Sequence, residues 1–217
     1  MAYDLEEQEQ IASLKAFWSK YGNLLTWVLI AALGSYSGYM FLKNRTATQS
    51  AEASGLYEQL LTSLLAKDNA KVQRIAGDVE SRYDSSSYAQ MSALAAAKSA
   101  FDAADLKTAK TQLNWVLAHG NDEYQSIAKL RLAGVLLDEK AYDEGLKLLA
   151  TPFLPQFAGA VADRKGDILV AQNKVAEARA AYQAALDAMD QKNPGRQLVE
   201  LKLEAIGGTV ATPKAAA

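Results

Sequence analysis

The stretch GDILVAQNKVAEARAAYQAAL, residues 166–186, decides the fold. Its apolar residues recur at helical spacing on both sides of Asn173, which predicts two helices joined by a short turn. Small residues stand where the two helices would approach closely, and bulky residues stand where they would fill the groove between them. These expected packing positions are Gly166, Leu169, Val175, Ala178, Tyr182 and Ala185. The stretch therefore predicts a tightly packed helical hairpin.

The same pattern recurs in more degenerate form upstream. A bulky residue is expected early in the second helix of each hairpin, at Val72, Leu106, Tyr142 and Val175. These positions are 34, 36 and 33 residues apart, close to the 34-residue period of the tetratricopeptide repeat. Chance alignment of alanine-rich hairpins remains an alternative. The sequence predicts an all-α, tetratricopeptide-like solenoid of about four hairpins.

Breaker residues divide this region into segments with helical periodicity and no strand alternation. We expect the repeat domain to occupy residues 43–206 and residues 207–217 to form a disordered tail. The expected helices cover residues 48–66, 70–83, 87–103, 105–118, 122–139, 142–150, 158–172, 175–190 and 195–206.

A different pattern precedes the repeats. Residues 24–42, LLTWVLIAALGSYSGYMFL, contain no charge, and a helix of that length spans about 28 Å, close to the hydrocarbon thickness of a bilayer. Because the run is long and Lys43 and Arg45 follow it at once, we expect a retained transmembrane helix and not a cleaved signal peptide. Residues 1–23 are expected to be a short tail, forming either a separate amphipathic helix or a continuation of the span. Two basic residues flank each end of the span, so charge alone does not determine topology.

The span carries a face of small residues, formed by Ala31, Gly34, Ser35 and Gly38. Small residues allow close backbone approach between helices in lipid, where hydrophobic drive is weak. We expect this face to pack against another membrane helix. The alternative is that glycine is simply common in membrane helices.

Composition argues against several kinds of chemistry. The formal net charge of -2 and a pI near 5.5 argue against a nucleic-acid partner. With no cysteine and with His119 as the only histidine, the usual zinc ligand sets are excluded. No nucleotide-binding or nucleophile-elbow motif occurs. We expect no catalytic, cofactor-binding or metal-binding residue and no small-molecule substrate, and we expect His119 to close a helix.

The whole layout resembles a known family. A tail reading MAYDLEEQEQIASLKAFWSKYGN, a single span, the segment RTATQSAEASGLYEQLL at residues 45–61, and degenerate hairpins are together similar to the YfgM-like family of ancillary SecYEG translocon subunits. The resemblance implies a single-pass protein of the bacterial inner membrane, with a cytoplasmic N-terminus and a periplasmic repeat domain. It also implies association with the SecYEG translocon, with a PpiD-type periplasmic chaperone and with inner-membrane lipid, and no catalytic residues.

Two functions follow from these observations. The first is a non-catalytic scaffold that assists the handling of translocated polypeptides. The second is a membrane-anchored regulatory adaptor whose repeat domain docks a soluble partner. The side of the membrane on which the repeat domain lies would distinguish them.

Overall fold

The computed structural model describes residues 2–209, and its regular elements in that range are all helical. The all-α fold predicted from the sequence is therefore confirmed. The elements are α1 (Ala2–Leu65), α2 (Asn69–Arg82), α3 (Ser87–Asp102), α4 (Leu106–His119), α5 (Asp122–Asp138), α6 (Tyr142–Leu149), a 3-10 turn η1 (Pro155–Phe157), α7 (Ala158–Ala171), α8 (Val175–Ala188) and α9 (Arg196–Ala205). Of the predicted disordered tail, residues 210–217 lie outside the described part of the chain.

The chain divides into two compact units at the boundary between Ala51 and Glu52. The first unit is the N-terminal part of α1. Helix α1 is continuous through the tail and the apolar run, which settles the open choice in favour of a continuing helix. The predicted helix start near residue 48 is wrong, because residues 43–51 contain neither proline nor glycine to interrupt α1.

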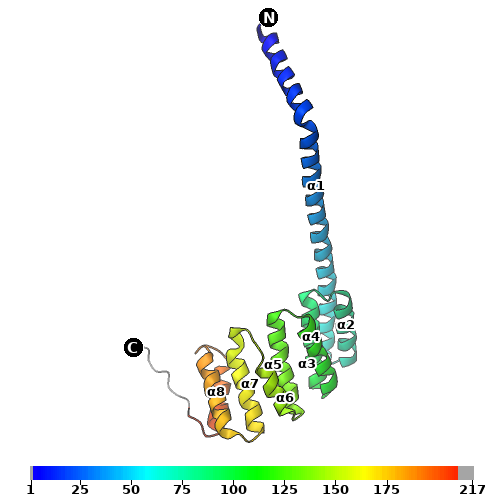
Figure 1. Cartoon of the computed structure of the whole chain (residues 1–217). Coiled ribbons are helices and arrows are strands. Elements are labelled where there is room, and N and C mark those ends of the chain that lie inside the picture. The colour runs from blue at the N-terminus through cyan, green and yellow to red at the C-terminus, as the bar shows by residue number, and fades with distance from the viewer. Residues whose placement is uncertain (1, 210–217) are drawn as a thin grey trace, which may run out of the picture. The chain divides into compact units, whose positions relative to one another are not determined.

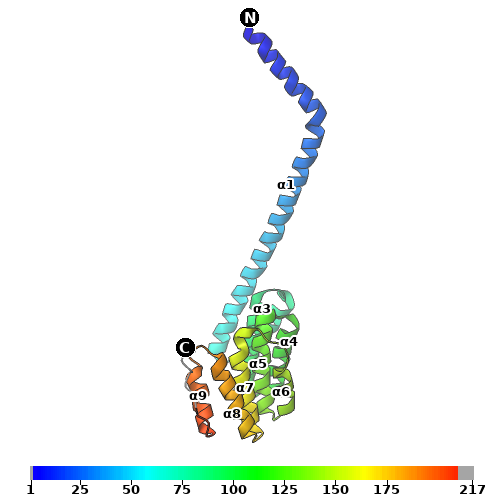
Figure 2. The ribbon, with the colours of Figure 1, turned by 60° about the vertical axis from the view of Figure 1, so that its left-hand side comes forward.

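The second unit is a series of helical hairpins. Its first hairpin pairs the end of α1 with α2, and α3–α4, α5–α6 and α7–α8 follow in chain order (Figure 1). Helix α9 packs beside α8 at the C-terminal end (Figure 2). The buried core consists of alanines and aliphatic residues contributed by neighbouring hairpins. This arrangement is the tetratricopeptide-like solenoid that the repeat pattern predicts.

The four hairpins share one turn. The residues at the turn, Lys67, Ala104, Lys140 and Asn173, all have left-handed φ values between 55° and 60°. In each case the next residue donates its N–H to the carbonyl five residues earlier, as in Lys174 to Leu169 at 2.9 Å and Ala141 to Leu136 at 2.8 Å. This is the Schellman arrangement that closes a helix C-terminus. Only Asn173 is a residue type that tolerates the left-handed region well.

These turns correct the register of the first hairpin. The second helices begin at Asn69, Leu106, Tyr142 and Val175, so the structural steps are 37, 36 and 33 residues. The predicted equivalent residue of the first hairpin, Val72, is wrong because it lies three residues too late. Val72 is fully buried one turn inside α2 and occupies the position of Ala178. The error arose because a buried valine matches the expected bulky residue better than the polar Asn69 does.

Candidate functional site

A groove lies on the second unit between α3, α4, α5 and α7. Its volume is about 450 Å³. Helices α3, α5 and α7 are the first helices of successive hairpins, so their exposed faces repeat along one side of the solenoid. The residues that line the groove include Phe101, Arg131, Gly134, Val135, Asp138 and Arg164. The groove combines an apolar surface with two guanidinium groups.

Arg131 lies against α3, where its Nη1 donates to the carbonyl of Leu94 at 3.1 Å. Burial of the guanidinium lowers the pKa of Arg131, because desolvation disfavours the charged form. No carboxylate among the described side chains pairs with it. Arg131 therefore presents to the groove a positive charge that has no carboxylate partner among the described residues.

Arg164 comes from α7 and packs over Gly134 of α5. A Cβ built at Gly134 would lie 3.5 Å from Arg164 Cζ, so the missing side chain leaves room for the guanidinium. Arg164 Nη1 contacts Asp167 Oδ2 at 3.4 Å, which is a long contact, and Arg164 Nε is buried without a hydrogen-bond acceptor. A buried donor without an acceptor is costly, so Arg164 has an unmet capacity to bind an oxygen.

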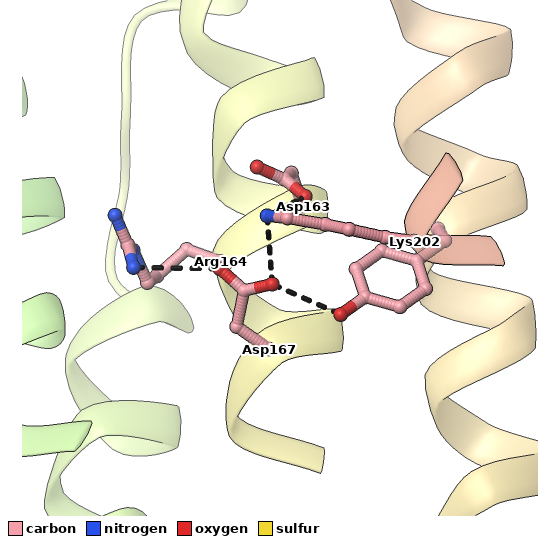
Figure 3. Close-up of polar contacts among 5 residues, drawn as sticks. Asp163, Arg164, Asp167 and Lys202 are labelled. Atoms are coloured by element: carbon pink, nitrogen blue, oxygen red, sulfur yellow. Dashed lines mark hydrogen bonds and ion pairs between the residues drawn. The ribbon is translucent and has the colours of Figure 1, made fainter. Parts of the chain in front are cut away.

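A second group of charged residues, the α7–α9 polar cluster, is formed by Asp163, Asp167, Tyr182 and Lys202. Lys202 Nζ lies 2.8 Å from an oxygen of each aspartate, and the Tyr182 hydroxyl donates to Asp167 Oδ1 at 2.9 Å (Figure 3). Burial raises the pKa of Asp163 despite Lys202, and it raises the pKa of Tyr182, with Asp167 adding to the rise. These contacts join α9 to the solenoid.

The structure brings most of the predicted repeat-packing residues together. Gly166 faces the Tyr182 ring, and a Cβ at Gly166 would lie 2.5 Å from Tyr182 Cδ1. Leu169 and Ala178 share one buried cluster, and Ala185 is buried with Tyr182 in the next. Val175 departs from the expectation, because it is 38% exposed at the first residue of α8.

The residues predicted to pack against another membrane helix, Ala31, Gly34, Ser35 and Gly38, make no tertiary contact in the described structure. All four are exposed, no atom lies within 4 Å of a Cβ built at either glycine, and Ser35 Oγ donates to the carbonyl of Ala31 within the helix. Helix α1 is the one described helix that is long and apolar enough to cross a membrane, with a mean hydropathy of 1.4 in its most apolar window and none of that window buried. The small-residue face is thus available to another helix.

Comparison with known proteins identifies the family. The family model described as a tetratricopeptide repeat-like domain matches residues 15–208. A protein of Neisseria gonorrhoeae named ancillary SecYEG translocon subunit is 35% identical over 95% of this chain and 100% of its own length. The chain belongs to the family of ancillary SecYEG translocon subunits. Proteins with the same name from Haemophilus influenzae and Escherichia coli are 29% and 27% identical over 94% and 83% of the chain, and over 98% and 87% of their own lengths. No solved structure matches the chain. The resemblance inferred from the tail and repeats is confirmed.

The groove arginines of this ancillary-subunit family member were not among the residues predicted from the sequence, although they follow the repeat. Arg131 and Arg164 each lie two residues before the small first-helix residue of their hairpin, Ala133 or Gly166. Asp102 and Asp138 also share one repeat position. Aligning the repeats by their charged residues as well as by their apolar residues would have shown these shared positions. Among the described residues, no group of three or more metal-ligating side chains is present.

The partly buried carboxyl group of Glu80 should make the stability of the repeat domain depend on pH. Glu80 Oε1 is buried without a hydrogen-bond partner, and burial raises the pKa of Glu80 to about 7, an effect that the charge of nearby His119 only partly offsets. His119 closes α4 as expected and stacks on Trp115, with ring centroids 4.4 Å apart. Since the unfolded chain releases this proton near pH 4.5, the folded state holds it more tightly between pH 4.5 and 7. Stability is therefore highest below that window and falls as the pH rises through it.

We expect Glu80→Gln to stabilise the repeat domain at pH 8 and to have little effect at pH 4.5, because glutamine mimics the neutral acid. Since Glu80 is only partly buried and solvent screens its charge, the expected gain at pH 8 is about 1–2 kcal/mol. Urea unfolding of the detergent-solubilised chain at the two pH values measures this. Glu58→Gln, at an exposed position of α1, is the matched control and should change stability equally at both pH values. An identical effect of Glu80→Gln at pH 4.5 and pH 8 would contradict the assignment.

Proposed function

We propose that this chain is a non-catalytic, single-span scaffold of the bacterial inner membrane that associates with the SecYEG translocon and assists in handling translocated polypeptides. The observation that carries the proposal is the match over 95% of this chain to a relative named for its place in that translocon. The apolar segment of α1 supplies a membrane anchor, and the solenoid supplies an extended binding surface. Anchoring raises the effective concentration of a weak binding surface near the channel, so modest affinity suffices.

In the proposed topology, residues 1–23 are cytoplasmic, residues 24–42 cross the membrane and residues 43–206 form a periplasmic domain. Family resemblance supports this orientation, and so does the rule that long domains translocate largely regardless of charge. Protease added to intact spheroplasts should digest the repeat domain. Protection in spheroplasts, with digestion after lysis, would place the domain in the cytoplasm and would favour the regulatory adaptor instead.

Partner identity is the direct test of the function. Mild crosslinking in native membranes, followed by mass spectrometry, should recover translocon subunits with this chain. The family resemblance adds a PpiD-type periplasmic chaperone as a second expected partner. Recovery of neither under conditions that crosslink the translocon subunits to one another would refute the proposal.

We further propose that the small-residue face of α1 contributes to this assembly. Leucine at Gly34 and Gly38 adds bulk where close backbone approach is needed, so Gly34→Leu with Gly38→Leu should insert normally but lose at least about half of the co-purified membrane partners. Leu29 and Leu33 are exposed and lie outside the small-residue face, so Leu29→Ala with Leu33→Ala serves as a control with the same number of substitutions. Unchanged co-purification with the glycine variant would assign the association to the soluble domain.

A further inference from the structure

The geometry of the groove indicates which class of polypeptide it would bind, and this inference rests on the proposed function. We propose that the groove between α3, α5 and α7 binds polypeptide segments in which an acidic side chain lies next to apolar side chains, with Arg131 and Arg164 binding the carboxylate. The two arginines come from different hairpins, and the groove between them is open to solvent.

The arginines carry unused hydrogen-bonding capacity. A guanidinium has five N–H donors in a planar fork that matches the two oxygens of a carboxylate. Arg131 uses one nitrogen, on the Leu94 carbonyl, and Arg164 uses one in a 3.4 Å contact with Asp167. Asp167 Oδ1 already accepts from Tyr182 and Lys202, so Asp167 belongs to the α7–α9 polar cluster. An external carboxylate would supply acceptors for the remaining guanidinium N–H groups that face the groove.

The other charged residues of the groove do not cancel the positive charges of Arg131 and Arg164. Lys98 and Asp102 neutralise each other at 2.6 Å. Asp138 follows Arg131 by seven residues on α5, which places it two turns, or about 10 Å, further along the helix. Arg164 packs at Gly134, between these two positions. The positive charges of the groove therefore lie at Arg131 and beside Gly134, and Asp138 discourages a second acid further along α5.

The walls between these charges are apolar. Phe101 is 40% exposed, and Leu113 and Val135 line the same groove. Burying an exposed aromatic ring on binding is favourable, whereas a free small acid could not use this surface. The combination of a carboxylate site with an apolar wall favours a polypeptide segment over a small anion. Polypeptides that are not yet folded expose such segments.

The test uses two fluorescein-labelled peptides with the full chain in lipid nanodiscs: GSELSFLSG, which carries one acidic side chain, and its amide twin GSQLSFLSG. Fluorescence anisotropy measures each Kd at fixed ionic strength. We expect the acidic peptide to bind at least about tenfold more tightly than its twin, as for one charge-assisted bidentate contact. Arg131→Gln with Arg164→Gln should remove this preference. Arg74→Gln, at an exposed position on α2 outside the groove, should preserve it.

A second variant distinguishes loss of binding from loss of folding. Gly134→Leu keeps both arginines and favours helix, but it places a side chain in the groove, so it should weaken binding of the acidic peptide at least about tenfold. Equal binding of the two peptides, a preference that survives in the double arginine variant, or normal binding to Gly134→Leu would each overturn the proposal. Failure of both peptides to bind would overturn it too. Crosslinking to the translocon tests the proposed function independently of these outcomes.

Discussion

Replacing Lys202 by methionine is expected to destabilise the repeat domain by about 2–3 kcal/mol. Methionine retains most of the apolar length of lysine but leaves Asp163 and Asp167, side chains that are 22% and 16% exposed, without their shared cation. Removing one partner from a mostly buried ion pair leaves uncompensated charge in a poorly solvated place. Because Lys202 lies on α9 and both aspartates lie on α7, the change should loosen α9 first.

Lys98→Met is the matched control for this prediction. Lys98 pairs with Asp102 at 2.6 Å, but both side chains are more than half exposed, so we expect a loss of at most about 0.5 kcal/mol. The effect of Lys202→Met should also shrink as the pH falls. Burial holds the pKa of Asp163 above its unfolded value, so acidification protonates Asp163 more readily in the folded state and relieves the repulsion. Urea unfolding at pH 7 and pH 4 measures both effects, and equal losses for the two lysine variants would refute the role of the cluster.

The same substitution at two glycines should have opposite effects. At Gly166, a new methyl group would meet the buried Tyr182 ring, which must move and carries the hydroxyl bonded to Asp167. We expect Gly166→Ala to destabilise the domain by about 1–3 kcal/mol through overpacking. At Gly77 of α2, no atom lies within 4 Å of the added Cβ. Gly77→Ala should therefore stabilise the domain by about 0.5–1 kcal/mol through helix propensity alone.

Thermal unfolding followed by circular dichroism measures both variants. The pair controls for the change in helix propensity, which is similar at two positions inside helices. A further variant, Gly166→Ala with Tyr182→Phe, separates the steric effect from the hydrogen bond, because the phenylalanine ring still clashes but carries no hydroxyl. Stabilisation by Gly166→Ala would show that α7 and α8 do not approach as closely as the structure indicates.

The fold was largely predictable because its signals are local. Breaker residues and apolar periodicity located the helices of the second unit to within a few residues. Two local predictions failed for identifiable reasons. No breaker separates the span from the first hairpin, so α1 runs on, and a polar residue, Asn69, opens α2 where the repeat pattern expects a bulky one.

The groove was not predictable in the same way. Its residues come from α3, α4, α5 and α7. What makes the arginines distinctive is that Arg131 has no acidic partner and that Arg164 has only a 3.4 Å contact with Asp167. The spacing of residues along the chain does not show which charged side chains lack a partner in the folded protein. Likewise, Asp163 and Asp167 look like solvated surface residues in the sequence, and only the packing of α9 brings Lys202 between them.

By itself, the sequence determined the helical class, the repeat, the apolar segment and the family, because each depends on residues that are close in the chain or on a pattern that recurs along it. Tertiary structure alone decided the close contact of Gly166 with Tyr182, the burial of Glu80 and the groove arginines. Desolvation, steric contact and charge pairing depend on distances between helices, and those distances arise only when the hairpins stack.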